Sequence, residues 1–413
     1  MKKLQEYPFF LSLFTVAFLP TYLIRFEIGW VRMNMLDILL CISILSFFLI
    51  GKRKSKTSKK EDGKKNQKKV FWLGVFFLFF GLFLSAIAGG LDAQALGIIK
   101  SWFVLPFLFA FVLHKYIWER DKRTLLFSAY GIGVLGSILF SWYRGFFLEG
   151  FTYDGRLVGW YDSPNQFAMF IAPFFLFLWI QIRWRISSQS FIFPLWLLYI
   201  LLISIGTTLI LTQSYGAFLS LGGAIILLEI LREGSWKRKL LYVFVGFCVF
   251  IGGMWFFGGD KGEAVRTFDE RSSLVSREMI WRSALHIGKD YWFFGIGPGN
   301  FQEYYLLYQQ YYPPYLEWAV PQPHNIYLAF WLQTGFVGLL GFLLIIGSIF
   351  FSFMCWFQEK KKMSAQENTH FLFLYAFFLL TSLWGLIDTP YWRNDLAVLF
   401  WIGIFLSIKD SQR

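Results

Sequence analysis

The chain is dominated by long apolar runs that are rich in phenylalanine. Each run holds about 20 residues with few or no charges, which is the length that an α-helix needs to cross the hydrocarbon core of a bilayer. Of the 413 residues, 52 are Phe and 56% are hydrophobic, a composition that soluble domains of this size do not have. Backbone polar groups inside a bilayer must be bonded internally, so these runs predict helices. We therefore expect an all-α polytopic membrane protein.

Twelve runs are predicted to span the membrane, with boundaries good to a few residues. They are 8–24, 35–51, 70–90, 95–114, 124–143, 165–182, 190–212, 216–231, 240–257, 335–357, 371–387 and 395–409. The expected organisation has three parts: residues 1–258 with the first nine spans and a basic loop at 52–69, a large extracytoplasmic loop at 259–334 that carries the active site, and residues 335–413 with the last three spans.

The distribution of basic residues predicts the orientation in the membrane. With the N-terminus inside, about two thirds of the 39 Lys and Arg residues lie in inner segments, as the positive-inside rule requires. Both termini are then cytoplasmic, and the net charge of +13 reflects topology rather than nucleic-acid binding. The polar segments 144–165, 212–216, 259–325 and 388–395 all face outward, which indicates an extracytoplasmic working face.

The long outer loop contains a predicted amphipathic helix from about Ser273 to Lys289. At 100° per residue, Arg277 falls in the centre of the apolar face that holds Ile280 and Ala284. A guanidinium in an apolar stripe is costly unless an anion meets it. A snorkelling arginine or a pair with a nearby carboxylate would explain the pattern structurally. We favour a functional role for Arg277.

His324 and Asn325 stand where an extended segment meets a helix. Pro321 and Pro323 keep the preceding chain extended, and an apolar run follows at once. The positive end of the helix dipole favours a neutral imidazole, which suits general-base work. For Asn325, helix capping and a functional role are equally good interpretations. His324 is the candidate base, whereas His114, His286 and His370 are interpreted as structural.

Several other functions lack support in the sequence. The three cysteines lie in apolar runs and indicate no disulfide or metal cluster, and no His, Cys, Asp or Glu set has metal-ligand spacing. The glycines of Gly295–Gly299 do not have dinucleotide-binding spacing and are interpreted as a turn. A membrane transporter remains an alternative, but the predicted spans lack the charged path that a transporter usually needs.

Five stretches together resemble the O-antigen ligase/polymerase superfamily of bacterial membrane proteins. Their order along the chain is also that of the superfamily. They are GRLVGWYDSPNQFAMFIAP (Gly155–Pro173), LTQSYGAFLSL (Leu211–Leu221), SREMIWRSAL with FGIGPGNF (within Ser276–Phe301), PHNIYLAFWLQTGFVGL (Pro323–Leu339) and DTPYWRNDLAVLFW (Asp388–Trp401).

The resemblance implies a metal-independent glycosyltransferase of the GT-C type without a cofactor. Its donor would be a glycan on a polyprenyl diphosphate such as undecaprenyl diphosphate. Its acceptor would be a hydroxyl of a glycan or lipid-linked molecule at the outer face of the bacterial cytoplasmic membrane. The loop arginine and histidine of the family match Arg277 and His324, which are the expected catalytic residues. Membrane lipids are expected partners, and nucleic acid is not.

Further residues are expected to bind substrate. The chain has Tyr215 where many members of the superfamily have an arginine that binds the diphosphate. Either the charge comes from Arg156, Arg266, Arg271 or Arg393, or donor binding is weaker or different in this chain. The complete set of expected substrate-binding residues is Arg156, Asn165, Tyr215, Arg271, Asn325, Asp388 and Arg393. Aromatic residues such as Trp160 and Trp318 suit either sugar stacking or the interfacial belt equally well.

Two activities remain open within this enzyme class. The protein transfers a finished glycan to a terminal acceptor, as a ligase does, or it polymerises lipid-linked repeat units. The chemistry is the same in both, because an acceptor hydroxyl displaces a diphosphate. A non-enzymatic transporter of lipid-linked glycans is the alternative outside this class. The sequence alone identifies neither the sugar nor the acceptor.

Overall fold

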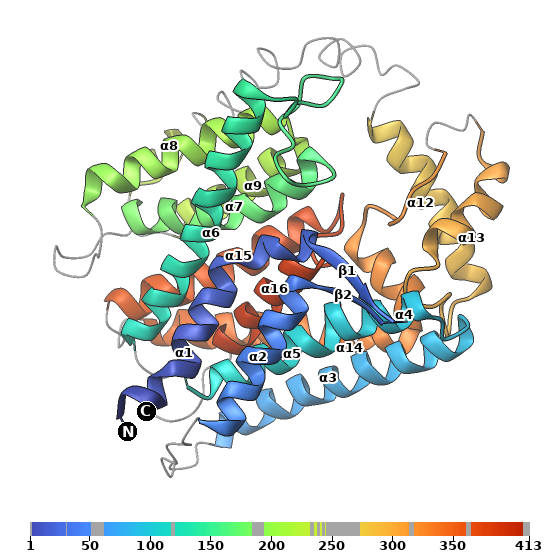
Figure 1. Cartoon of the computed structure of the whole chain (residues 1–413), viewed down its shortest axis with the longest axis horizontal. Coiled ribbons are helices and arrows are strands. Elements are labelled where there is room, and N and C mark those ends of the chain that lie inside the picture. Colours follow the sequence, from blue (N-terminus) through green and yellow to red (C-terminus); the bar gives the residue numbers. More distant parts are fainter. Residues whose placement is uncertain are drawn as a thin grey trace. The chain divides into compact units, whose positions relative to one another are not determined.

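The computed structural model describes residues 2–29, 31–50, 62–116, 120–183, 194–231, 235–237, 240, 241, 244, 273–313, 318–360 and 365–407. The described chain is mainly helical, as expected, and it divides into two compact units. Unit 1 comprises residues 1–126, 273–362 and 385–413, and unit 2 comprises residues 127–272 and 363–384. Figure 1 shows the elements, and each unit is described by itself.

Unit 1 holds both ends of the chain and the helices between residues 273 and 311. Its elements are α1 (Lys2–Ala17), η1 (Leu19–Leu23), β1 (Arg25–Ile28), β2 (Val31–Asn34), α2 (Met35–Leu49), α3 (Asp62–Ala88), α4 (Ala93–Ile98), η2 (Ile99–Val104), α5 (Leu105–His114), α12 (Ser273–Asp290), α13 (Phe301–Tyr308), η3 (Gln309–Tyr311), α14 (Ile326–Glu359) and α16 (Asn394–Ser407). Unit 2 contains most of α6 (Arg120–Phe147) together with α7 (Pro164–Arg183), α8 (Leu195–Thr212), α9 (Tyr215–Leu231) and α15 (Ala365–Trp384).

Six described helical segments are long and apolar enough to cross a membrane. They are Gln67–Ala88, Ala93–His114, Lys122–Phe147, Pro164–Arg183, Leu195–Thr212 and Ile326–Glu359, and α2, α9 and α16 are shorter apolar helices. The prediction of twelve spans is therefore not confirmed. The predicted span 240–257 lies almost entirely outside the described residues. α16 has only 14 residues, fewer than the roughly 20 that a perpendicular crossing needs.

A β-hairpin follows α1 and was not expected in an all-α protein. β1 and β2 pair antiparallel, with Arg25 opposite Asn34 and Glu27 opposite Arg32. The two strands begin and end with the connection, residues 25–34, between the predicted spans 8–24 and 35–51. Asn34 ends the hairpin and caps α2, because its Oδ1 accepts the backbone N–H of Asp37 at 2.9 Å.

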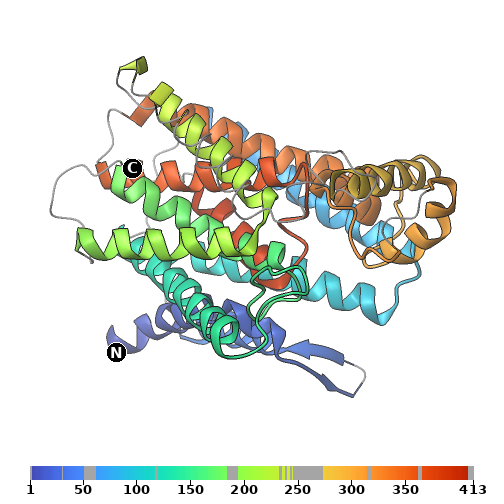
Figure 2. The same ribbon diagram turned by 90° about the horizontal axis from the view of Figure 1, so that it is seen from above.

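The longest helix of unit 1, α14, packs along α3 over most of its length (Figure 2). Glycines make this approach possible. A Cβ at Gly74 would lie 2.9 Å from the carbonyl oxygen of Gly341, and a Cβ at Gly81 would overlap the backbone of Gly338. Small residues that bring two backbones together are typical of helix pairs in membranes.

α14 is interrupted at Gly335, where φ is +70°. In an unbroken helix the N–H of Phe336 would bond the carbonyl of Leu332. Here the N–H of Phe336 donates to the carbonyl of Phe293 at 2.9 Å, and the carbonyl of Leu332 accepts the N–H of Ile296 at 2.7 Å. The segment after α12 is thus inserted into the hydrogen-bond ladder of α14 and fixes the position of α12.

The glycine-rich stretch Gly295–Gly299 forms the turn that the sequence predicted. All three of its glycines have positive φ, a conformation in which side chains are costly. Gly297 N–H donates to Ser85 Oγ at 3.1 Å, and Gly299 N–H donates to Gln333 Oε1 at 2.9 Å. The turn, which lies between α12 and α13, is thus bonded to both α3 and α14.

Candidate functional site

The candidate site in unit 1 is centred on His324, in the segment that leads into α14. His324 has φ of +46°, in the left-handed region that few residues other than glycine adopt. Its carbonyl accepts the indole N–H of Trp281 from α12 at 3.2 Å. About a third of its side chain is exposed, at 33%. Strained backbone conformations that neighbouring elements stabilise are common at functional sites, where they orient a side chain.

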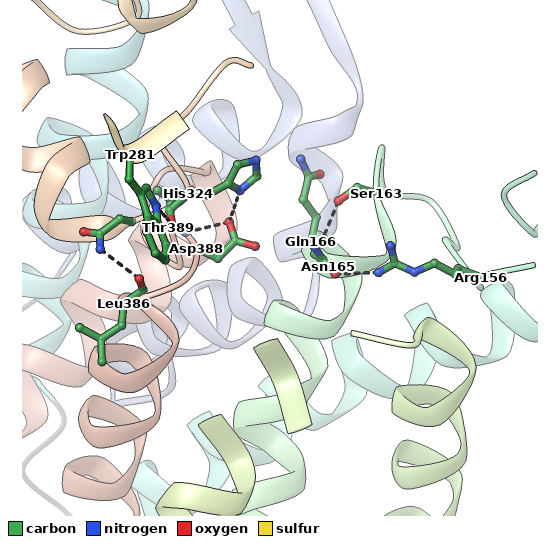
Figure 3. Close-up of polar contacts among 10 residues, drawn as sticks. Arg156, Ser163, Asn165, Gln166, Trp281, His324, Leu386, Asp388 and Thr389 are labelled. Atoms are coloured by element: carbon green, nitrogen blue, oxygen red, sulfur yellow. Dashed lines mark hydrogen bonds and ion pairs between the residues drawn. The ribbon is translucent and has the colours of Figure 1, made fainter. Parts of the chain in front are cut away.

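Asp388 is the direct partner of the imidazole (Figure 3). His324 Nδ1 lies 3.0 Å from Asp388 Oδ1, and the same oxygen accepts the backbone N–H of Thr389 at 2.9 Å. The Asp388 side chain is only 7% exposed. Asp388, expected to bind substrate, is instead paired with the candidate base across 64 positions of the chain.

Two hydrogen bonds attach the loop that carries Asp388 to the start of α14. The N–H of Ile326, the first residue of α14, donates to the carbonyl of Gly385 at 2.7 Å. Asn325 Nδ2 donates to the carbonyl of Leu386 at 3.0 Å. The loop between α15 and α16 is therefore attached to the start of α14, and the His324–Asp388 contact follows from that attachment.

The charge on Asp388 is stabilised by its surroundings. Burial by itself would raise the pKa of this carboxyl group, but the imidazole of His324, its hydrogen bond, the guanidinium of Arg277 and the N–H of Thr389 together hold the pKa below its usual range. An ionised carboxylate has no proton to donate. His324 Nδ1 must then carry the hydrogen in this contact, which leaves Nε2 of a neutral ring as a proton acceptor.

Arg277 approaches the same carboxylate from α12. The helix spans Ser273–Asp290, as predicted. Its buried face includes Ser276, Ile280 and Ile287, and Arg277 is half-buried at the border of that face. The expectation that Arg277 occupies the centre of the apolar face is therefore wrong. One helical turn later, Trp281 bonds to the His324 carbonyl, so this border of α12 faces the site.

Asn325 and Arg393 have structural contacts that account for much of their hydrogen-bonding capacity. Asn325 caps α14, with Oδ1 accepting the N–H groups of Tyr327 and Leu328 at 3.0 Å each. Arg393 is buried and forms a bidentate pair with Asp395, at 2.6 and 2.8 Å. The capping interpretation of Asn325 is confirmed.

The remaining described candidates lie together in unit 2. Arg156 Nη2 donates to Asn165 Oδ1 at 2.7 Å (Figure 3), and Arg156 Nε donates to the carbonyl of Thr212 at 2.9 Å. Thr212 ends α8, so the arginine satisfies a carbonyl at a helix C-terminus. Tyr215 begins α9 directly after this turn and lies within electrostatic range of Arg156.

The candidates thus form two groups that the structure describes separately. Arg277, His324 and Asp388 converge in unit 1, and Arg156, Asn165 and Tyr215 converge in unit 2. The predicted residues Arg266 and Arg271 lie outside the described residues. Within the described ranges, no group of three or more His, Cys, Asp or Glu side chains is arranged to hold a metal ion.

Trp281 is a site residue that the sequence analysis did not identify as functional. Its side chain is half-buried in α12. The bond from its indole to the His324 carbonyl positions the candidate base. Only its spacing of four residues from Arg277 could have indicated this role from sequence.

Comparison with known proteins supports the interpretation of the motifs. The family described as O-antigen ligase matches residues 199–343, which include Arg277, His324 and Asn325. This match confirms the resemblance to the O-antigen ligase/polymerase superfamily. No curated protein sequence matches the chain significantly.

Proposed function

We propose that this protein transfers a glycan from a polyprenyl-diphosphate carrier to an acceptor hydroxyl at the outer face of the bacterial cytoplasmic membrane. The contact between His324 Nδ1 and Asp388 Oδ1, with Arg277 acting on the same carboxylate, is the observation that carries the proposal. A lipid-linked glycan donor and an acceptor agree with the family match over residues 199–343.

His324 is the proposed general base. Its Nε2 removes the proton of the acceptor hydroxyl while the hydroxyl oxygen forms a bond to the anomeric carbon of the donor. The bond between that carbon and the phosphate oxygen breaks in the same step, and the diphosphate leaves with the electron pair. Asp388 orients the ring through Nδ1 and stabilises the imidazolium that forms, as carboxylates do in related acid–base pairs.

Arg277 is proposed to bind the departing diphosphate. A guanidinium presents several N–H donors in a plane and matches phosphate oxygens in a bidentate manner. The position of Arg277 at the border between buried and exposed faces of α12 suits contact with a charged substrate. Stabilising the leaving group by the positive charge of Arg277 requires no general acid. The proposed enzyme is a metal-independent transferase of the GT-C type, as the resemblance to the superfamily implies.

Arg156, Asn165 and Tyr215 are proposed as a second set of donor contacts. Their mutual contacts pre-organise the guanidinium of Arg156 at the end of α8. Pre-organised cations bind phosphate without losing much side-chain entropy on binding. Arg271, Asn325 and Arg393 remain proposed contacts as well, although Asn325 and Arg393 have the structural bonds described above.

The test is to disrupt the gene and examine envelope glycans. Full-length chains accumulating on the polyprenyl carrier indicate a ligase, and single repeat units indicate the alternative, a polymerase. Restoration by wild-type protein but not by His324→Ala, at equal protein abundance, would support the proposed chemistry. An unchanged glycan profile after disruption, in a strain with no second copy, would contradict it.

A further inference from the structure

Unit 1 contains a polar pocket that the proposed chemistry does not use. It lies between the β1–β2 hairpin and the segment formed by α4 and η2, and its volume is about 470 Å³. This volume falls in the range of roughly 300–1,000 Å³ that is typical of small-molecule sites. Side chains that could contact a ligand come from both walls and from the first residue of α16: Arg25, Glu27, Arg32, Gln94, Trp102 and Asn394.

The position of Trp102 is fixed by the loop that also carries Asp388. Pro106 has no N–H, so it cannot bond the carbonyl of Trp102 as an α-helix would require. The hydroxyl of Tyr391 donates to that carbonyl instead, at 2.7 Å. The helix takes the π form from Ile99 to Val104 at this point, a feature often found at functional sites. The pocket wall and the candidate catalytic pair therefore share the loop 388–394.

Two buried asparagines present amide donors to the pocket. Asn34 and Asn394 are each 8% exposed and both line it. Asn34 Oδ1 accepts the N–H of Asp37, and Asn394 Oδ1 accepts the indole N–H of Trp102 at 3.0 Å. These bonds fix which end of each amide is the oxygen. Neither Nδ2 has a partner among the described residues, so both NH₂ groups are available to a ligand in the pocket.

The outer edge of the pocket carries charges of both signs. Arg32 and Glu27 form an exposed pair at 3.2 Å on the hairpin, and Arg25 lines the same wall. Lys100 links η2 to this wall. Its Nζ donates to the carbonyl of Arg32 at 2.7 Å and forms an ion pair with the buried carboxylate of Asp37 at 2.9 Å. The lining thus offers N–H donors, a carboxylate acceptor and the apolar ring of Trp102.

We propose that this pocket binds a saccharide unit of one of the two glycan substrates. A sugar ring combines many hydroxyl groups, which donate and accept hydrogen bonds, with an apolar face that packs on an aromatic ring. A lipid chain would leave the buried amides unsatisfied, at an energetic cost. The inference rests on the proposed function, and it adds a glycan-binding subsite remote in sequence from the outer loop.

Binding is measured by isothermal titration calorimetry on the full-length protein in detergent. The donor probe is the oligosaccharide released by mild acid from the polyprenyl-diphosphate glycan of the same organism, and the acceptor probe is its deacylated envelope glycolipid. Asn394→Asp keeps the acceptor for the Trp102 indole but removes the NH₂ group. Arg25→Gln removes a charge on the opposite wall. Each substitution is expected to weaken the binding of one of the two probes roughly tenfold. The probe that is affected shows whether the pocket binds the donor or the acceptor.

Arg282→Gln is the matched control, because Arg282 is 63% exposed and does not line the pocket. It should bind both probes as the wild type does. Trp102→Phe, which keeps an aromatic ring, replaces Asn394→Asp if that variant does not fold. The proposal is overturned if neither probe binds the wild type saturably, or if folded pocket variants bind as tightly as the control. His324→Gln should bind normally without transfer, which separates failure of the subsite from failure of the proposed reaction.

Discussion

Replacing Asp388 with asparagine tests the His324–Asp388 pair with little change of shape. The substitution keeps an oxygen that can accept from Thr389 and His324 but removes the negative charge. At the 3.0 Å separation of Nδ1 and Oδ1, and with an effective dielectric constant of about 20, two unit charges attract by about 5.5 kcal/mol. His324 is 33% exposed, so solvent screening reduces the effect to about 3 kcal/mol.

The loss of about 3 kcal/mol of imidazolium stabilisation corresponds to a roughly 100-fold slower transfer step. The assay is single-turnover transfer with purified lipid-linked donor, at saturating acceptor. Asp92→Asn is the control, because asparagine caps a helix as well as aspartate and Asp92 caps α4. A transfer rate for Asp388→Asn within threefold of the control would refute the role given to the pair.

The Asp388→Asn substitution should also change how the stability of the protein depends on pH. The pKa of Asp388 is lower in the folded protein than in the unfolded chain, where it is about 4. The ionised carboxylate therefore contributes fully to the free energy of unfolding above about pH 4, and this contribution is lost as the pH falls through the pKa of the folded state. The difference in melting temperature between wild type and Asp388→Asn should therefore be largest near neutral pH and shrink below about pH 4. A difference that stays constant down to pH 3 would contradict the ionised state of Asp388.

Three further predictions concern the neighbouring elements. Arg277→Lys keeps the charge but loses the bidentate fork, so it should lose most transfer activity, as Arg277→Ala does; normal transfer by Arg277→Ala at equal abundance would exclude the diphosphate contact. Gly335→Ala places a side chain at φ +70° against the carbonyl of Phe293 and should lower stability by about 1–3 kcal/mol, seen as a lower melting temperature; an unchanged value would contradict the described break in α14. In a cysteine-free background, a cysteine at Gln310 should react with an impermeant maleimide in intact cells and one at Lys360 should not, and the reverse pattern would overturn the predicted orientation.

Local patterns predicted the helices of the site well. The amphipathic period located α12 within a residue, and two prolines followed by an apolar run located the start of α14 and the cap at Asn325. Both signals depend on residues that are close in the sequence, where periodicity and capping rules apply. The turn at Gly295–Gly299 was predicted for the same reason.

Contacts between distant segments could not be predicted in this way. Nothing in the local sequence indicates that Asp388 meets His324, because that contact depends on the attachment of Gly385 to Ile326. Periodicity placed Arg277 in the centre of the apolar face, whereas it is half-buried at the border of that face, since the buried face is set by the partners of α12 rather than by its own composition. The hairpin at Arg25–Asn34 was missed because two four-residue strands give a weak alternation signal.

The most direct test of the account is the pH dependence of transfer by His324→Gln. Glutamine can hold a hydrogen bond to the acceptor hydroxyl but cannot accept its proton, so the variant separates positioning from base catalysis. Transfer is measured with purified lipid-linked donor between pH 5 and 9, with wild type alongside. We predict a rate roughly 10²–10⁴-fold below wild type and loss of the rise in rate that follows deprotonation of the base. A wild-type rate with an unchanged pH profile would show that His324 only orients the acceptor.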